Sequence, residues 1–264
     1  MNIIVCIKQV PETGNVKIDP ETHTLIRSGV PSIINPMDTY AIEEALRWKE
    51  KLGASTTVLT MGPPQAHDAL REAISMGIDQ AIVLSDQKFA GSDTYVTAYT
   101  LALAVRKLAP YDLIFCGKQA IDGDTAQVGP GLAEHLGIAH IAYVKKIEEI
   151  DQERAVLRAQ RLMEDGYEVV DIRLPALLTV VKEINEPRFP SLKGKMRARK
   201  CEIPVWRAED LGGEEMMGFG LSASPTRVKA IFAPPGRGKG EIFNGEASVM
   251  AQELVERLRA QKVI

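Results

Sequence analysis

The chain has 264 residues, and 32 lysines and arginines against 35 aspartates and glutamates give it a formal net charge of −3. Its 45% of hydrophobic and 25% of charged residues are ordinary for a globular protein, whereas 5% of aromatic residues offers few rings for stacking single-stranded nucleic acid. The near-neutral charge argues against a general nucleic-acid binder, and no apolar run approaches the roughly 18 residues of a membrane-spanning helix.

The cysteines and the N-terminus indicate the compartment. Cys6, Cys116 and Cys201 lie far apart and form no CxxC motif, which argues against a disulfide scaffold or a structural zinc site. The N-terminal sequence lacks the charged region and the long apolar stretch of a secretory signal, and it predicts a first strand instead. We therefore expect a cytoplasmic protein that holds no metal.

Residues 2–145 predict an α/β domain, because short β-branched runs alternate with segments of helical periodicity. Continuous apolar strands separated by helices imply a mostly parallel sheet with helices on both faces. The first predicted helix carries apolar residues on one side and Glu43, Glu44, Arg47 and Glu50 on the opposite side. The predicted strands are residues 3–7, 56–60, 81–84, 113–116 and 141–144, and the predicted helices are residues 37–52, 65–76, 94–108 and 126–136.

The next region, residues 146–183, predicts a β-hairpin followed by one more strand. Residues 155–162 and 167–174 flank the turn sequence Glu164-Asp165-Gly166. Residues 177–181 form a buried apolar run, which we expect to return to the sheet antiparallel to it or at its edge.

From residue 185 onward the chain is rich in proline and glycine, and we expect irregular structure there. A final helix is predicted over residues 245–261. Such a tail suggests packing on a partner, and the alternative is a tail that folds back on its own domain. The apolar residues of the final helix are Val249, Leu254, Val255 and Leu258.

Common catalytic and phosphate-binding signatures are absent. The sequence has no GxGxxG after the first strand, no GxxxxGK[ST], no GxSxG and no HExxH. We therefore assign no residue as catalytic.

The most informative segment is the loop that follows strand 113–116 and opens helix 126–136. Ligands bind beyond the carboxyl ends of parallel strands, and a helix N-terminus offers free N–H groups to anions. Gly123 allows a ligand to approach the backbone closely, and Thr125 and Gln127 add side-chain donors. The sequence therefore predicts an anion-binding loop.

Two carboxylates in this loop would repel a phosphate unless they have another role. Asp124 fits the N-cap position of the helix, where it would accept N–H bonds from the first turn. Asp122 either contacts a ribose hydroxyl or orders the loop. The alternative interpretation is an ordinary capped turn without a ligand.

Two other loops have similar chemistry. Residues 91–94, Gly-Ser-Asp-Thr, precede a predicted helix, although alone they fit a simple cap. Residues 35–38 precede the first helix. Two or three such loops at one edge of the sheet would together line a nucleotide cleft.

A basic segment follows the predicted domain, with five basic residues among residues 193–200. One interpretation is a solvated surface. The other is a docking segment in which Leu192 and Met196 are apolar anchors within a charged rim. Nucleic acid is the weaker choice of partner because the whole chain is acidic.

Six segments, spread in order over nearly the whole chain, carry a resemblance to one family. They are residues 5–10 (VCIKQV), 35–38 (NPMD), 117–122 (GKQAID), 164–169 (EDGYEV), 174–180 (LPALLTV) and 185–192 (NEPRFPSL). These segments resemble the β subunit of electron-transfer flavoproteins. The resemblance implies an α/β nucleotide-binding domain of the adenine-nucleotide-hydrolase-like type (1–184), a partner-recognition loop and irregular segment (185–234), and a C-terminal arm and helix that pack on an α subunit (235–264).

The resemblance also implies cofactors and partners. In that family a β subunit forms a heterodimer with an α subunit that holds one FAD. The β subunit of ordinary carriers holds AMP as a structural ligand, whereas that of the electron-bifurcating branch holds a second FAD. This FAD accepts hydride from NADH and sends one electron to a low-potential acceptor, ferredoxin or flavodoxin. The other electron passes through the α-subunit FAD to a flavin dehydrogenase of the acyl-CoA type.

The loop sequence resembles the bifurcating branch. It reads Asp-Gly-Asp-Thr-Ala-Gln over residues 122–127, whereas the AMP-binding version typically has a bulkier Asp-Asp-Asp run. Gly123 and Ala126 would leave space for a diphosphate and a flavin. We therefore expect FAD, with an AMP-binding carrier or a stand-alone ATP-binding module as the alternatives.

The resemblance assigns roles to individual residues. Those implied at the adenine and ribose end are Cys6, Asn35, Asp38 and Met61. Those implied at the phosphates are Asp122, Gly123, Asp124, Thr125, Ala126, Gln127 and Gly129. Those implied in partner docking are Leu192, as the hydrophobic anchor, with Lys193, Lys195, Met196 and Arg197.

Overall fold

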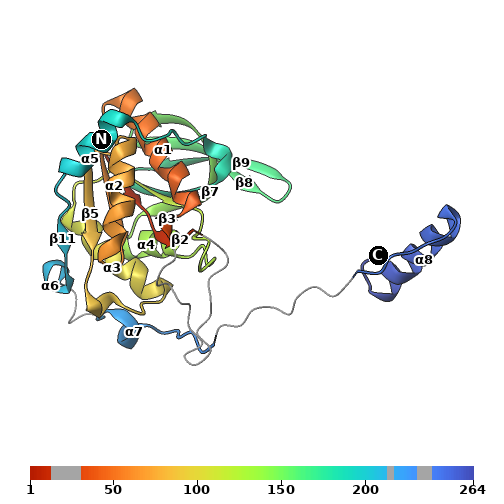
Figure 1. The fold of residues 1–264 in the computed structure, drawn as a ribbon. Coiled ribbons are helices and arrows are strands. Elements are labelled where there is room, and N and C mark those ends of the chain that lie inside the picture. Colours follow the sequence, from red (N-terminus) through yellow and green to blue (C-terminus); the bar gives the residue numbers. More distant parts are fainter. Residues whose placement is uncertain (13–30, 213–216, 231–239) are drawn as a thin grey trace.

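A computed structural model describes residues 1–12, 31–212, 217–230 and 240–264 (Figure 1). Its main feature is a nine-stranded sheet with the strand order β11-β5-β4-β1-β6-β10-β7-β8-β9. The strands from β11 to β7 pair in parallel, and β8 pairs antiparallel with both β7 and β9. The expected α/β class with a mostly parallel sheet is confirmed. The strands are β1 (Asn2–Cys6), β2 (Gln9–Pro11), β3 (Ser32–Ile34), β4 (Ser55–Met61), β5 (Gln80–Leu84), β6 (Leu113–Gly117), β7 (Ala139–Asp151), β8 (Val156–Met163), β9 (Gly166–Arg173), β10 (Ala176–Val180) and β11 (Val205–Trp206).

Helices cover both faces of the parallel part of the sheet. None of those in the described residues combines the length and the apolar character that crossing a bilayer requires. The α-helices are α1 (Pro36–Leu52), α2 (His67–Met76), α3 (Thr94–Lys107), α4 (Val128–Leu136), α5 (Leu192–Lys200), α6 (Ala208–Leu211), α7 (Gly220–Ala223) and α8 (Ala247–Ala260). The short 3-10 helices are η1 (Pro64–Ala66), η2 (Gln87–Phe89) and η3 (Lys182–Ile184).

The parallel strands are apolar throughout because their side chains alternate between two helical layers. In β1, Ile3 and Val5 are buried in a core that includes residues of α1, α2 and α5. Ile4 and Cys6 are buried in a second core that includes residues of α3, α4 and α6. This arrangement fixes which end of each strand is left for loops and ligands.

The order of the strands reverses beside β1. From β1 the chain passes through α1 to β4 and then β5 on one side, and α3 carries it back to β6 on the other side. In an open parallel sheet, the carboxyl ends of the two strands at such a reversal leave a crevice where ligands bind. The loop between β6 and α4 (residues 118–127, the β6–α4 loop) therefore lies where a ligand is expected.

One sequence-based expectation about the sheet was wrong. The hairpin of β8 and β9 forms as predicted, but the following strand, β10, is neither antiparallel nor at an edge. It lies between β6 and β7 and is parallel to both. All five of its residues are buried, as is typical of a strand covered by helices on both faces.

Two residues on the polar side of α1, Glu43 and Glu44, are also buried, beneath residues 185–188, whereas Arg47 and Glu50 are exposed. Arg188 donates from Nε to Oε2 of Glu43 at 2.8 Å, and Asn185 donates from Nδ2 to Oε2 of Glu44 at 3.0 Å. Burial alone would raise the pKa of Glu43, but hydrogen bonds from Arg188 and Arg47 outweigh it and lower that pKa. The polar side of α1 therefore holds a later segment of the chain in place.

Residues 192–211 are more regular than expected. They form α5, β11 and α6, and β11 adds a parallel strand beside β5. Helix α5 lies so close to α2 that a Cβ on Gly194 would come within 2.0 Å of the carbonyl oxygen of Ser75. The three functional ranges stay a prediction, whereas the packing joins residues up to 211 to the α/β body.

The predicted C-terminal helix is present as α8, and it lies apart from the α/β body (Figure 1). None of its residues is buried. Val249 and Leu254 are each about half exposed, at 50% and 46%. An amphipathic helix whose apolar residues are exposed in this way is suited to a partner surface.

Candidate functional site

The candidate site begins where β1 and β6 end. The carboxylate of Asp38, in the first turn of α1, accepts a hydrogen bond from the backbone N–H of Lys8 at 2.7 Å and another from that of Gly117 at 3.2 Å. Asp38 therefore ties the ends of the two strands on either side of the reversal. Its side chain is buried, and burial raises its pKa to about 7 although these hydrogen bonds favour the charged form.

Asn35 holds the β6–α4 loop against the start of α1. Its Nδ2 donates to the carbonyl oxygen of Gln119 at 2.9 Å, and its Oδ1 accepts from the backbone N–H of Ile121 at 3.1 Å. Asn35 is fully buried. Asn35 and Asp38, both predicted to contact the adenine end of a nucleotide, are thus occupied by backbone groups that shape the site from beneath.

The two loop carboxylates each have a partner within the chain. Nζ of Lys8 lies 2.6 Å from Oδ1 of Asp122, so the charge of Asp122 is compensated. The side-chain amide of Gln119 donates to Asp124. The expected repulsion between these carboxylates and a bound phosphate is thereby reduced. The ion pair fits a role of Asp122 in ordering the loop, which stays a prediction.

The backbone of the loop is strained at two positions. Asp124 has φ 52° and Ala126 has φ 54°, a region that residues other than glycine rarely adopt. Such outliers persist where the surrounding structure holds them, and they gather at ligand sites. A Cβ on Gly123 would meet nothing within 4 Å, so the protein itself leaves open space above the loop.

The predicted N-cap of α4 was wrong. The helix begins at Val128, two residues later than expected, with Gln127 at the N-cap position and no side-chain hydrogen bond to the first turn. Asp124 is too early in the chain to cap it. Gly129 in the first turn is buried, and a Cβ there would lie 2.5 Å from Cγ2 of Thr179. Gly129 therefore allows α4 to pack close to β10. Separately, no side chain caps the N-terminus of α4.

The remaining predicted site residues differ in their exposure to solvent. Cys6 ends β1 as a buried residue, and Met61, at the end of β4, is half-buried. Cys116 pairs with Cys6 across β1 and β6, and a hydrogen bond between the two thiols, together with burial, raises the pKa of Cys116. Cys116 was not among the predicted site residues, because only the strand register brings it beside Cys6. All the loop residues predicted to hold the phosphates are exposed or partly exposed: Asp122, Gly123, Asp124, Thr125, Ala126 and Gln127.

The second predicted loop is closed by the chain itself. Asp93 caps α3 by accepting from the backbone N–H groups of Tyr95 and Val96, each at 3.1 Å. Its other oxygen accepts from the backbone N–H of Thr226 at 3.0 Å and from its hydroxyl at 2.6 Å. Residues 91–94 therefore form the simple cap that was the alternative interpretation.

Comparison with known proteins supplies the family. The electron transfer flavoprotein domain matches residues 22–211. The chain belongs to the family of electron transfer flavoprotein β subunits. It is 52% identical to "Electron transfer flavoprotein subunit beta" of Thermoanaerobacterium thermosaccharolyticum, over 100% of each chain. It is 48% identical to the protein of the same name from Clostridium acetobutylicum and to "Caffeyl-CoA reductase-Etf complex subunit CarD" of Acetobacterium woodii, again over 100% of each chain.

Membership of this family gives the chain an α subunit as its partner and places it among proteins that exchange electrons with redox dehydrogenases through a flavin. The predicted docking residues lie on α5. Leu192 is 78% exposed and Met196 is 57% exposed, so both are free to act as anchors. Arg197 instead donates to the carbonyl oxygen of Ile74 at 2.7 Å, which holds α5 on the body of the β subunit.

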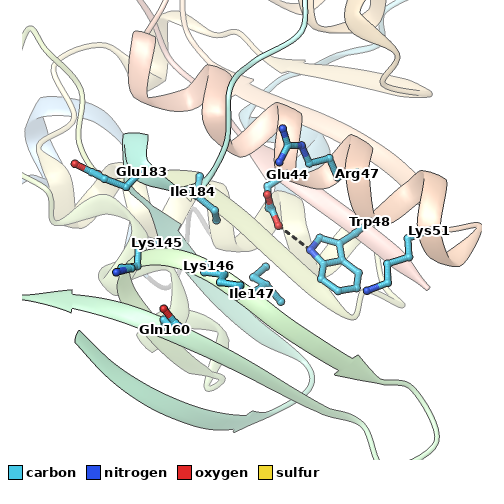
Figure 2. A pocket seen from close by; sticks show the side chains of 10 residues that line it. All are labelled: Glu44, Arg47, Trp48, Lys51, Lys145, Lys146, Ile147, Gln160, Glu183 and Ile184. Atoms are coloured by element: carbon cyan, nitrogen blue, oxygen red, sulfur yellow. Dashed lines mark hydrogen bonds between the residues drawn. The ribbon is translucent and has the colours of Figure 1, made fainter. Parts of the chain in front are cut away.

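A surface cavity lies on another part of the β subunit (Figure 2). It has a volume of about 600 Å³ and is formed between α1, β7, β8 and η3. Trp48 in its wall donates from Nε1 to Oε1 of Glu44 at 2.8 Å, and Nζ of Lys51 lies 4.3 Å from the centre of the Trp48 ring. None of the predicted nucleotide-binding residues lines it. Its lining residues are Glu44, Arg47, Trp48, Lys51, Lys145, Lys146, Ile147, Gln160, Glu183 and Ile184.

Proposed function

We propose that this β subunit belongs to an electron-bifurcating flavoprotein and holds FAD at the β6–α4 loop. The observation that carries the proposal is the open, strained and uncapped loop at the reversal of the strand order. It offers the N-terminus of α4 to an anion and leaves free space above Gly123. A diphosphate with a flavin attached needs that space, whereas a single phosphate does not.

The residues present fit a dinucleotide. Lys8 compensates the charge of Asp122 at 2.6 Å, so the loop can accept a diphosphate despite its carboxylates. The exposed side chains of Thr125 and Gln127 add donors at the same place. Cys6 and Met61, at the ends of β1 and β4, form the apolar end of the site. An adenine would pack there.

The redox chemistry belongs to the cofactor. Bound FAD supplies uptake of a hydride from NADH, with release of one electron to a low-potential acceptor such as ferredoxin or flavodoxin and of the other to the α-subunit FAD. The chain's own residues bind and orient it. Asp38 and Asn35 fix the strand ends and the loop from beneath, and the N–H groups of the first turn of α4 would bind the phosphates.

The partners follow from the same proposal. The relative CarD carries the name of a complex with caffeyl-CoA reductase, and this favours a flavin dehydrogenase of the acyl-CoA type as the partner of this chain. Leu192 and Met196 on α5 would dock it, with Lys193 and Lys195 in the charged rim. The exposed apolar side of α8 would pack on the α subunit.

Counting flavins tests the proposal. The β subunit is co-expressed with its α subunit, and the purified heterodimer is assayed for FAD and AMP and titrated with NADH. We expect two FAD per heterodimer and reduction of flavin by NADH. One FAD together with one AMP, and no reaction with NADH, would show the AMP-binding carrier instead. A chain that purifies alone with ATP bound would support the stand-alone module.

A further inference from the structure

Tyr143 is an exposed and strained residue at the carboxyl edge of the sheet. It has φ 61°, the left-handed region that bulky residues avoid, at an irregularity in the pairing of β7 with β10. The side chain is nonetheless 37% exposed. A strained backbone that presents a large ring to solvent has no benefit for the core, so the ring itself needs an explanation.

A hydrogen bond to β10 holds the strained backbone of Tyr143 in place. The backbone N–H of Tyr143 donates to Oγ1 of Thr179 at 3.2 Å. Thr179 is buried, and its Cγ2 occupies the space left by Gly129 in the first turn of α4. Tyr143 is thus connected through Thr179 to the helix that begins directly after the β6–α4 loop.

The ring of Tyr143 lies beside a cation. Nζ of Lys118 is 5.1 Å from the centre of the ring, and the backbone N–H of Lys118 donates to the carbonyl oxygen of Val180 at 2.9 Å. Lys118 is the first residue of the β6–α4 loop. No carboxylate pairs with its ammonium group in the described part of the chain. Ring and ammonium together form a surface suited to a planar ring system that carries negative charge.

The distance from the adenine end of the proposed site to Tyr143 is one that a dinucleotide could span and a mononucleotide could not. Met61 and Cys6, at the adenine end of the proposed site, end β4 and β1, whereas Tyr143 lies on β7. The strand order β4-β1-β6-β10-β7 contains four strand spacings, which amount to about 19 Å. A ligand whose adenine lies at β4 and whose phosphates lie over the β6–α4 loop reaches Tyr143 only if a second ring system follows the phosphates.

We propose that Tyr143 and Lys118 form the surface on which the isoalloxazine ring of the FAD packs. This inference rests on the proposed function, since AMP has no such ring. Tyr143 contributes a stacking face, and Lys118 contributes a positive charge that favours the reduced, more negative ring. Neither residue was among the predicted ligand contacts.

Substitution of Tyr143 tests the stacking role in the heterodimer. After removal of the nucleotide bound to the β subunit, we expect Tyr143→Ala to lower the affinity for FAD about tenfold and the affinity for ADP less than twofold. Tyr143→Phe should retain both affinities. Tyr143→Gly also lacks the ring but relieves the strain at φ 61°, so it should fold at least as stably as the wild type while losing FAD affinity to the same degree.

Tyr167 provides the matched control. It is 54% exposed, and Nζ of Lys145 lies 4.3 Å from the centre of its ring, but it belongs to the β8–β9 hairpin. Tyr167→Ala removes the same kind of pair and should leave FAD affinity unchanged. Equal loss of FAD and ADP in Tyr143→Ala, or no loss of either, would overturn the proposal. Failure of that variant to assemble with the α subunit would assign the ring to the subunit interface and overturn it as well.

Lys118 has a separate readout. We expect Lys118→Met to bind FAD but to shift the reduction potential of the second flavin to a more negative value, and Lys118→Arg to restore it. An unchanged potential in Lys118→Met would refute its electrostatic role. A wild-type heterodimer with AMP in place of the second FAD would refute the proposed function, whereas normal FAD binding by Tyr143→Ala would refute only the role of Tyr143.

Discussion

Two helices begin at the same edge of the sheet, and their N-termini are treated in opposite ways. The N-terminus of α3 is capped by Asp93, and Thr226 covers the other oxygen of that carboxylate. The N-terminus of α4 has Gln127 at its cap position without a side-chain hydrogen bond. Free N–H groups at a helix end need partners, so the chain completes one end itself and leaves the other open to water or to the proposed ligand.

The loops that precede the two helices also differ: the one before α3 is packed against the chain, and the one before α4 is open. Gly91 before α3 has φ 75°, and a Cβ there would lie 3.0 Å from Cβ of Leu221. Gly123 before α4 has open space around it, and its neighbours Asp124 and Ala126 carry the strain instead. The packing of the chain requires a glycine at position 91, whereas it leaves room for a side chain at position 123.

The largest expected effect is a pH dependence that separates two carboxylates at this edge. Burial raises the pKa of Asp38 to about 7, from 3.8. For Asp93 partial burial acts in the same direction, but hydrogen bonds from Thr226 and the first turn of α3 outweigh it and lower the pKa. Because the folded state binds a proton at Asp38 more tightly than the unfolded state does, stability due to Asp38 is present below pH 4 and is lost as the pH rises to about 7.

We expect this loss to be on the order of 3–4 kcal/mol in the free energy of unfolding, measured by urea denaturation of the chain between pH 4.5 and 8. The control is Asp38→Asn, which cannot titrate and should remove the part of the slope due to Asp38, leaving that of Glu44 and Glu72, whose pKa values burial also raises. Asp93→Asn should leave the slope in place, because Asp93 titrates below its ordinary pKa of 3.8 and outside this range. A flat wild-type profile would mean that Asp38 is charged in the folded protein throughout.

The next effect concerns the two glycines. We expect Gly123→Asp to lower the FAD affinity of the heterodimer about a hundredfold, since the new carboxylate would enter the space proposed for the diphosphate without a partner. The free energy of unfolding should change by less than about 0.5 kcal/mol, because a side chain at Gly123 meets no protein atom within 4 Å. Flavin content after dialysis and urea denaturation provide the two measurements.

Gly91→Ala is the matched variant. It should lower the free energy of unfolding by about 1–2 kcal/mol, because its φ is 75° and Leu221 leaves little room, and it should keep its FAD. If Gly123→Asp retained full flavin and normal reduction by NADH, the β6–α4 loop would not be the cofactor site. A loss of flavin in Gly91→Ala would instead remove the distinction between the two helix ends.

The local patterns in the sequence were sufficient for most elements of the α/β body but not for α5, β11 and α6, and the position of the site stays a prediction. Apolar runs predicted β1, β4, β5, β6 and both strands of the hairpin, and the segment after β6 was predicted as the ligand loop. The order of strands is not a local property, so the place of β10 inside the sheet was missed. Likewise, the family resemblance implied Asn35 and Asp38 as ligand contacts, whereas their hydrogen bonds to Gln119, Lys8 and Gly117, which are distant in sequence, became visible only in the fold.

The missed features share one cause. The sequence around Tyr143 is that of a regular strand, and nothing in it marks a left-handed residue, because the irregularity arises from pairing with β10. In the same way, the sequence of α1 does not show that Glu43 is buried, because Arg188 arrives from 145 positions further along the chain. Contacts of this range require the fold before they can be predicted.

The smallest expected effect tests the caps themselves. Asp93→Ala should lower the free energy of unfolding by about 1–2 kcal/mol, since it removes a helix cap together with two hydrogen bonds from Thr226, and it should leave FAD affinity unchanged. Gln127→Ala, at the corresponding position of α4, should cost less than about 0.5 kcal/mol and lower FAD affinity severalfold. A Gln127→Ala variant as unstable as Asp93→Ala would show that α4 is capped by its own chain, and the proposed role of its N-terminus in holding a diphosphate would be wrong.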